Sequence, residues 1–266
     1  MRESFSEAAE LIWECWHGGA VIEALPDPLR PMSRAEGYAI QHHFETFSGK
    51  PLFGWKIAAT SIAGQKHIGV SGPLAGRLLQ ERVFEAGSVL DFGANRMAVA
   101  EPEFAFKMAK TIAPRAEPYT QDEVMEAVAS LHPGIEVPDS RFEDFVTAGE
   151  AQLIADNACA HQFVIGEAMP ESWLSIDLSK HETQISTKNE ITGELLSHNG
   201  VGANVLGDPR IALTWLVNEL SSHKITLKVG MVVTTGTSAV PIPIKAGDRV
   251  KADYGALGSL SFSFAA

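Results

Sequence analysis

Residues 100–107, which read AEPEFAFK, place two carboxylates at a spacing that could do chemistry. On a β-strand, residues two apart face the same way, so Glu101 and Glu103 would share a face with Lys107. Carboxylates stacked in this manner repel each other unless solvent or a cation separates them. The E-x-E pattern by itself favours solvent, that is, an amphipathic strand with a wet outer face. Pro102 lacks a backbone donor, which predicts a sheet edge or a bulge at this point.

A third carboxylate shifts the interpretation from solvent toward a cation between these groups. Glu136 lies in the segment GIEVP between two β-branched residues and would project from the opposite face to them. Three carboxylates without His or Cys suit a hard octahedral cation such as Mg²⁺ or Mn²⁺, and leave positions open for a chelating substrate. Taken alone, Glu136 is typical of a surface residue.

Lys56 is the next candidate because it lies inside the mostly apolar run FGWKIA. A lysine in such a run must be paired or reach water with its ammonium. Near a metal-bound oxyanion, that ammonium could stabilise an enolate or deliver a proton. The alternative is an ordinary surface lysine at the end of a strand.

Two further features could contribute to a site. The run GMVVTTGT predicts a strand entering a glycine turn, where hydroxyls and backbone N–H groups could hold a carboxylate or a carbonyl oxygen. A plain turn explains this run equally well. His67 and His161 are candidates for pocket lining.

The elements that must position these residues are of mixed type. Helical spacing and capping signals predict helices near the N-terminus, from Ser33, from Thr120 over TQDEVMEAVASL, and over residues 208–221 with Pro209 in the first turn. The last helix would present Ile211 and Trp215 on its apolar face. Alternation predicts strands at 97–109, 134–140, 182–188 and 190–197, and in the C-terminal tail. The sequence therefore predicts an α+β fold with a helical N-terminal part and a β-rich core.

Composition excludes several classes of function. The chain has 266 residues, with 21 Lys and Arg against 33 Asp and Glu, and this net charge of −12 disfavours nucleic acid as a partner. Two cysteines are too few for a disulfide framework, and the acidic start does not read as a signal peptide. Neither zinc-ligand spacing, nor a G-x-S-x-G elbow, nor a phosphate loop occurs. We expect a soluble, cytoplasmic protein without membrane contact.

Seven segments, in this order, resemble the 2-keto-4-pentenoate hydratase / 4-oxalocrotonate decarboxylase branch of the fumarylacetoacetate hydrolase superfamily. The resemblance runs from about residue 35 to the C-terminus and rests on GWKIAATS, VAEPEFAFKMA, GIEVPDSRF, LIADNACAHQFVIG, VLGDPRIALTWLVNEL, KVGMVVTTGTS and KAGDRVKADYGALGSLSFSF. It implies a mixed β-roll or barrel core, with residues 1–75 as a helical or mixed region that contributes Lys56 and residues 76–266 as the catalytic core. It also implies a homo-oligomer.

The same resemblance implies a divalent metal, Mg²⁺ or Mn²⁺, held by Glu101, Glu103 and Glu136, with Lys56 as an active-site cation. The reaction it implies is hydration of a 2-hydroxy-2,4-dienoate to a 4-hydroxy-2-oxo acid, through an enolate at C2 that the metal and Lys56 stabilise. The substrate carboxylate would bind at Thr235, Gly236 and Thr237.

Other reactions would use the same stabilised enolate. The first alternative is decarboxylation of a 2-oxo dicarboxylate such as 4-oxalocrotonate. C–C bond hydrolysis of an acylpyruvate-like substrate ranks lower, because the H-x-x-E dyad of that branch is not found after Lys56. A binding protein that keeps the metal and lacks turnover is the rival from outside the enzymes.

Two positions depart from the family pattern. Hydratases of the family often carry an acidic residue near the P-x-x-G that here reads Pro73-Leu74-Ala75-Gly76, and neither Leu74 nor Ala75 is acidic. Cys159-Ala160-His161 stands where a small polar Ser and a Gly are expected. His161 is the candidate to supply the lost acid–base function, and a repacked pocket with an altered substrate is the alternative.

Overall fold

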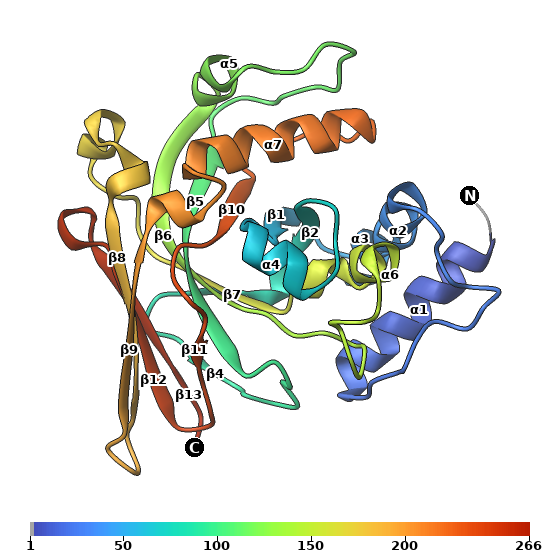
Figure 1. Ribbon diagram of the computed structural model, residues 1–266, viewed down its shortest axis with the longest axis horizontal. Coiled ribbons are helices and arrows are strands. Elements are labelled where there is room, and N and C mark those ends of the chain that lie inside the picture. The colour runs from blue at the N-terminus through green and yellow to red at the C-terminus, as the bar shows by residue number, and fades with distance from the viewer. Residues whose placement is uncertain (1–2) are drawn as a thin grey trace.

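Two β-sheets and a group of N-terminal helices make up the protein, as a computed structural model that describes residues 3–266 shows (Figure 1). The larger sheet has the strand order β2-β1-β10-β5-β6-β7-β3, with β11 paired to β5 outside this path. The smaller sheet has the order β4-β13-β12-β8-β9. Helices α1, α2, α3 and α6 gather at one end of the molecule, and the long strands of the smaller sheet lie at the other (Figure 1).

The bounds of the elements are as follows. The α-helices are α1 (Glu3–Gly18), α2 (Arg34–Gln41), α3 (His43–Ser48), α4 (Ile62–His67), α5 (Gln121–Met125), α6 (Glu150–Ala155) and α7 (Pro209–Ser222). The strands of the larger sheet are β1 (Leu52–Ala58), β2 (Leu74–Leu79), β3 (Val83–Glu85), β5 (Val99–Met108), β6 (Val128–Val137), β7 (Gln162–Ile165), β10 (Val232–Thr237) and β11 (Ile242–Pro243). The strands of the smaller sheet are β4 (Val89–Leu90), β8 (Glu182–Asn189), β9 (Leu195–Val201), β12 (Asp248–Asp253) and β13 (Ser259–Phe264). Short 3₁₀ turns include η1 (Gln80–Arg82) and η2 (Asn157–Cys159).

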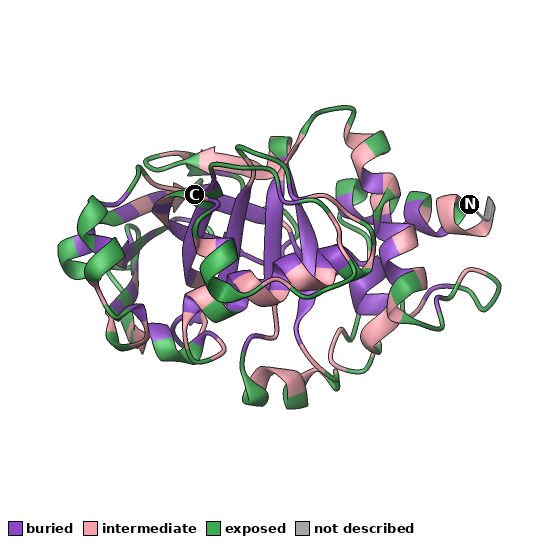
Figure 2. Cartoon of the chain, turned by 90° about the horizontal axis from the view of Figure 1, so that it is seen from above, coloured by how far each residue is buried: buried purple, intermediate pink, exposed green. Residues whose placement is uncertain are grey.

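The centre of the larger sheet is its most buried part. Strand β5 lies between β10 and β6 and is antiparallel to both, and β1 runs parallel to β10. Phe104 and Phe106 of β5 and Trp55 of β1 are almost fully buried in the main hydrophobic core. Figure 2 shows these central strands buried along most of their length. A strand held on both sides in this way is a rigid support for side chains that must keep their positions.

The two sheets are joined by a buried tyrosine. Tyr254 follows β12 in the smaller sheet, and its hydroxyl lies 2.7 Å from the carbonyl of Glu103 and 3.0 Å from that of Gly134. One hydroxyl has a single proton, so it donates to one of these two carbonyls at a time. This contact attaches the C-terminal tail to β5 and β6, close to the glutamates that these two strands carry.

The N-terminal helices form a second hydrophobic cluster. Ile12 and Trp16 of α1 pack there with Ile40 of α2 and Phe44 of α3. The side chain of Gln41 is buried and donates to the carbonyls of residues 75 and 154, which attaches α2 to β2 and α6. Residue 75 lies within β2, which pairs with β1 in one sheet, and the division of the chain at that residue stays a prediction.

The helix predictions are partly confirmed. Asp208 caps α7 and Pro209 begins it, as expected. Thr120 and Glu123 form the full capping box, but α5 ends at Met125 and the residues from Val128 belong to β6, so the predicted helix over 120–131 was too long. Ile211 is 45% exposed and does not belong to the buried face of α7. Tertiary pairing of residues 128–131 with β5 overrides the local helical pattern.

The strand predictions hold better. Alternation located β5, the end of β6 and β8, while residues 190–194 of the predicted fourth strand form the turn before β9. Pro102 lies on a central strand, so a sheet edge there was wrong, whereas the neighbouring strand β10 has an irregular register between Thr234 and Thr237. The α+β class with a helical N-terminal part is confirmed. Within residues 3–266, no helix is both long and apolar enough to cross a membrane.

Gly54 provides a test of this packing. A Cβ at this position would lie 1.8 Å from the carbonyl oxygen of Val232 on the paired strand β10, closer than the strands allow. We expect Gly54→Ala to lower the free energy of unfolding by at least about 3 kcal/mol, measured by urea denaturation. Gly72→Ala is the matched control, because a Cβ there meets nothing within 4 Å. Equal stability of the two variants would contradict this arrangement of β1 and β10.

Candidate metal centre and active site

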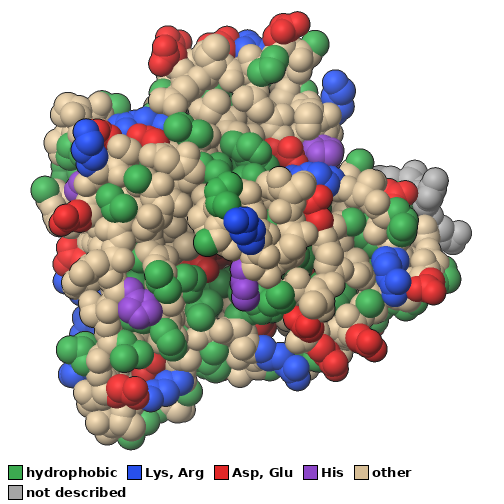
Figure 3. All heavy atoms as spheres, viewed as in Figure 1, with side chains coloured by type: hydrophobic (Ala, Val, Ile, Leu, Met, Phe, Trp, Pro, Cys, Tyr) green, Lys and Arg blue, Asp and Glu red, His purple; other side chains and the backbone are tan. Residues whose placement is uncertain are grey.

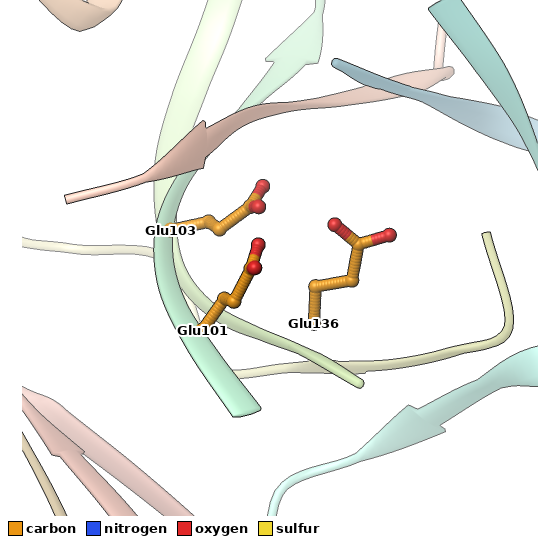
Figure 4. Close-up of side chains that lie close together, drawn as sticks. All are labelled: Glu101, Glu103 and Glu136. Carbon is orange, nitrogen blue, oxygen red and sulfur yellow. The ribbon is translucent and has the colours of Figure 1, made fainter. Parts of the chain in front are cut away.

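Three carboxylates converge beside the centre of the larger sheet. Glu101 and Glu103 project from β5 and Glu136 from β6, and their carboxyl groups point toward one another (Figure 4). Glu101 is paired directly with Glu136 across the two strands, and Glu103 with Gly134. One oxygen atom of each carboxylate lies within 4.8 Å of the others. The strand alternation and the antiparallel register together therefore build the cluster that the sequence predicted.

Glu103 is fully buried and is held from one side. Its Oε2 accepts hydrogen bonds from the Thr234 hydroxyl and, at 2.9 Å, from the backbone N–H of Gly236. Its Oε1 is buried and has no hydrogen-bond partner in the described part of the chain. The two donors from β10 thus orient one oxygen and leave the other available to a ligand.

Glu136 is also buried, and both of its oxygens lack a hydrogen bond with any residue the structure describes. The Nζ of Lys56 forms an ion pair with Oε1 at 3.0 Å, at an angle that is not that of a hydrogen bond. Buried carboxylate oxygens without partners are rare, since each loses its hydration for nothing in return. Together with Oε1 of Glu103, these atoms fit a bound cation.

The cluster is electrostatically unfavourable without a cation. Burial raises the pKa of Glu101 to about 7, with a further rise caused by Glu136, and Lys56 offsets part of this. Burial and the neighbouring carboxylates also raise the pKa of Glu103 well above its ordinary value. A divalent cation would reverse this balance by giving all three ionised groups an opposite charge.

Lys56 lies on β1 and faces the cluster. Its Nζ donates a hydrogen bond of 2.9 Å to the carbonyl of Ala158. Burial lowers the pKa of Lys56, but Glu136, Glu101 and Glu103 outweigh this effect and leave the pKa raised. The group is therefore an ammonium, held about 3 Å from one of the carboxylates.

A strained turn positions the carbonyl that Lys56 contacts. Asn157, Ala158 and Cys159 form η2 with φ values of 55°, 51° and 59°, a left-handed conformation that is uncommon outside glycine. The buried Asn157 side chain stabilises the turn by accepting from the N–H of Arg77 and donating to its carbonyl. A Cβ on Gly76 would lie 2.3 Å from the Asn157 carbonyl, so glycine is required for this approach.

A buried ion pair anchors the start of the same turn. Asp156 accepts from the guanidinium Nε of Arg141 at 2.5 Å and from the Ser140 hydroxyl at 2.7 Å. Both charged groups are almost fully buried, so removal of either would leave an uncompensated charge. Segment 139–141 follows directly after β6, and the pair therefore links the strand of Glu136 to the turn of Ala158.

The glycine turn of β10 makes hydrogen bonds within the protein, and its predicted contact with a substrate carboxylate stays a prediction. The Thr235 hydroxyl donates to the carbonyl of Phe104, and the Thr237 hydroxyl to that of Ala239. Gly236, with φ of 93°, presents its N–H to Glu103. The sequence analysis missed Thr234, whose hydroxyl reaches Glu103, because the register of β10 against β5 decides which threonine faces the cluster.

His161 is not part of this group. Its Nδ1 accepts a hydrogen bond from the indole N–H of Trp16 at 2.8 Å, and it lines a pocket that includes neither the three glutamates nor Lys56. The predicted catalytic role of His161 has no support from this geometry. Leu74, at a position where hydratases often have an acid, is buried in the main core. Burial and Asp156 raise the pKa of Cys159 to about 12, so its side chain is a neutral thiol.

Comparison with known proteins agrees with this architecture. The family described as fumarylacetoacetate (FAA) hydrolase, C-terminal, matches residues 73–265, which is more than half of the chain. The chain belongs to this FAA hydrolase family. The fold predicted from the resemblance, a mixed β-roll or barrel core of the fumarylacetoacetate hydrolase type with a helical N-terminal region, is thereby confirmed.

Named hydratases and a solved structure match most of the chain. The chain is 29% identical to 2-hydroxyhexa-2,4-dienoate hydratase of Comamonas testosteroni, over 95% of this chain and 94% of that protein. It is 30% identical to 2-oxo-hept-4-ene-1,7-dioate hydratase of Escherichia coli, over 86% of each. Among solved structures, 4-oxalocrotonate decarboxylase from Pseudomonas putida G7, complexed with magnesium and adipate, has a TM-score of 0.85, 27% identity, and coverage of 99% and 98%. The predicted branch, hydratases together with this decarboxylase, is confirmed.

The charge repulsion within the cluster can be measured without an activity assay. Folded Glu101 holds its proton up to about pH 7, whereas an unfolded glutamate releases it near pH 4.5. The stability of the metal-free protein should therefore fall as pH rises between these values. Glu101→Gln should reduce this fall, part of which Glu103 would still cause, and should raise the free energy of unfolding at pH 8 by about 1–2 kcal/mol, since partial exposure screens the charge.

Urea denaturation in EDTA at pH 4.5 and pH 8 tests this expectation. Glu85→Gln, which removes the charge of an exposed glutamate at the end of β3, is the control. A Glu101→Gln variant that is less stable than the parent at pH 8 would show that the carboxylates do not repel one another in the metal-free protein.

Proposed function

We propose that this protein is a divalent-metal-dependent lyase that hydrates a 2-hydroxy-2,4-dienoate to a 4-hydroxy-2-oxo acid. The observation that supports it most is the buried trio of glutamates, with three oxygens that lack hydrogen bonds, next to the buried ammonium of Lys56. The curated relatives named above are hydratases of substrates of this type.

The cation would be held by Glu101, Glu103 and Glu136. An all-carboxylate set favours Mg²⁺ or Mn²⁺ over softer metals, and the similar decarboxylase structures contain magnesium or calcium. When bound, such a metal would act as a Lewis acid toward the oxygens of a 2-oxo acid. Oε2 of Glu103 would keep its hydrogen bonds with Thr234 and Gly236, which fix the direction of the carboxylate.

Lys56 would perform the protein's part of the chemistry. Its ammonium lies in a buried site, where a fixed charge stabilises a developing enolate more strongly than it would in water. The hydrogen bond to the Ala158 carbonyl restricts the direction of Nζ, so one or two of its protons stay available to the substrate's C2 oxygen. Lys56 would also exchange a proton with the carbon chain as the dienol becomes an α,β-unsaturated 2-oxo acid.

The glycine turn would contribute less directly than the sequence suggested. Thr235 and Gly236 support β5 and Glu103, whereas Thr237 is partly exposed. We assign the contact with the substrate carboxylate to Thr237, whose hydroxyl must then turn away from the Ala239 carbonyl. In the view of Figure 3, hydrophobic side chains surround a hollow near the centre of the molecule, which would suit the apolar tail of a dienoate.

Decarboxylation of a 2-oxo dicarboxylate is the second candidate. Loss of CO₂ uses the same enolate and needs no acidic group to direct water, and the position where hydratases often have an acid is here the buried Leu74. The similar solved structure of a 4-oxalocrotonate decarboxylase favours it as well. C–C bond hydrolysis and binding without turnover rank below both. A homo-oligomer and a cytoplasmic location also stay proposals.

NMR of the purified protein decides between the two reactions. With 2-hydroxypenta-2,4-dienoate and Mg²⁺ or Mn²⁺, we expect 4-hydroxy-2-oxopentanoate to form, and we expect EDTA to stop it. A parallel sample with 4-oxalocrotonate tests for release of CO₂. Product from the dicarboxylate alone would replace hydration with decarboxylation, and no metal-dependent product from either would contradict a lyase.

Lys56→Met should lower kcat by at least about a hundredfold, because it removes an electrostatic group that acts on the developing charge. Metal content, measured by plasma emission spectroscopy, should stay near that of the parent, since Lys56 is not a ligand in this proposal. Lys107→Met, on the same strand as the glutamates but exposed, should keep its activity within twofold of the parent. Loss of metal from Lys56→Met would instead assign Lys56 a structural role.

A further inference from the structure

A second pocket lies between α1 and the larger sheet, away from the carboxylate cluster. Its volume is about 200 Å³, and its walls come from the end of α1, η1, the loop after β4, segment 139–141 and the start of β7. The side chains on which the argument rests are Trp16, Arg82, Arg141 and His161. We call this cavity the Arg82 pocket. Neither Lys56 nor any of the three glutamates of the cluster lines it.

Arg82 is a cation without an ion-paired partner in the described part of the chain, and the charge of its neighbour Glu81 raises its pKa less than burial and Arg141 lower it. Its guanidinium has no hydrogen bond and no carboxylate within ion-pair distance among the residues that the structure describes, and its one contact of note is with the Trp16 ring, 5.1 Å away. Arg82 is partly buried, and burial together with Arg141 lowers its pKa. A guanidinium that has lost part of its hydration and gained no acceptor is unfavourable unless a ligand supplies one.

His161 adds a second donor to the same pocket. Because Nδ1 accepts the indole N–H of Trp16, the proton of the neutral ring must be on Nε2. Nε2 has no partner in the described part of the chain, and burial, Arg82 and Arg141 lower the pKa of His161 to about 3. The ring is therefore neutral under ordinary conditions and offers one N–H.

The other charged groups of the pocket are already occupied. Arg141 is paired with Asp156 and also donates to the carbonyls of Asp139 and Ala160. Asp139 accepts from the backbone N–H groups of residues 96 and 97, and Asp91 from that of Gly93. Both aspartates keep their negative charge and a second oxygen, but neither lies within ion-pair distance of Arg82. The guanidinium of Arg82 and Nε2–H of His161, beside the Arg141 cation, remain as donors without a partner among the described residues.

From this arrangement we infer that the Arg82 pocket binds a small oxyanion, a carboxylate or a phosphate, between the guanidinium of Arg82 and Nε2–H of His161, against the Trp16 ring. The planar fork of a guanidinium matches two oxygens of either group, and the pocket volume suits an ion of this size. Because Trp16 belongs to α1, a bound anion would also attach that helix to the core. This site is independent of the proposed lyase activity, and its test involves no turnover.

The indole N–H of Trp16 is a local probe of the pocket. In ¹H–¹⁵N spectra of the full protein with Mg²⁺, the Trp16 indole resonance is assigned from its loss in Trp16→Phe. We expect titration with inorganic phosphate, or with succinate as the carboxylate probe, to shift this resonance saturably. The probe that binds with the higher affinity shows whether the pocket prefers a phosphate or a carboxylate. No saturable shift with either probe up to 20 mM would overturn the proposal.

Charge-matched variants identify the residue responsible. Arg82→Gln should weaken binding by at least about tenfold, the loss expected for charge-assisted hydrogen bonds. Arg96→Gln, which removes an exposed charge close to the pocket but not in its lining, should change the affinity by less than twofold. Arg82→Lys keeps the positive charge but lacks the planar guanidinium, so its affinity for the anion should lie between those of the parent and Arg82→Gln. Unchanged affinity in Arg82→Gln, or an equal loss in Arg96→Gln, would overturn the assignment.

Discussion

Like charges held together inside the protein are the constraint on which the rest of the structure depends. Glu101, Glu103 and Glu136 each place a carboxylate oxygen within 4.8 Å of the others in a largely buried site, and burial opposes the ionisation of Glu101 and Glu103. Such an arrangement costs stability in the absence of a cation, so the fold must hold it by other means. Strand β5, paired on both sides in the centre of the larger sheet, is the element that does this.

Other features of the fold serve the same cluster. Thr234 and Gly236 of β10 orient one oxygen of Glu103, and Tyr254 attaches the C-terminal tail to the backbone of β5 and β6. On the opposite side, the left-handed turn at Ala158 and the glycine at position 76 allow Lys56 to lie beside Glu136. Backbone strain and a buried lysine thus occur together, as is common where structure serves chemistry.

The sequence predicted the identities of the central residues more successfully than their supports. Glu101 and Glu103 share a face by strand alternation, and their residue types and neighbours marked Glu136 and Lys56 as candidates before the family resemblance assigned their roles. The register between β10 and β5 is irregular at residues 234–237, which no local pattern reveals, so the contact of Thr234 with Glu103 was not predicted. A backbone carbonyl such as that of Ala158 has no signature in the sequence at all. The predicted helix over 120–131 was too long because the residues from Val128 pair with β5 and form a strand instead.

The surroundings of His161 could not be predicted from the residues next to it in sequence. His161 was a candidate because it follows the Asp-Asn-Ala segment in sequence. In the structure it contacts Trp16, which is 145 residues away along the chain. The chain therefore separates two polar regions: the carboxylates with Lys56, and the Arg82 pocket beside α1.

The claim that the three glutamates form a metal site is tested most directly by anomalous X-ray diffraction from crystals grown with Mn²⁺. The account predicts one strong anomalous peak bounded by the carboxylates of Glu101, Glu103 and Glu136. A fully occupied Mn²⁺ elsewhere in the protein, with no density between these three side chains, would contradict it.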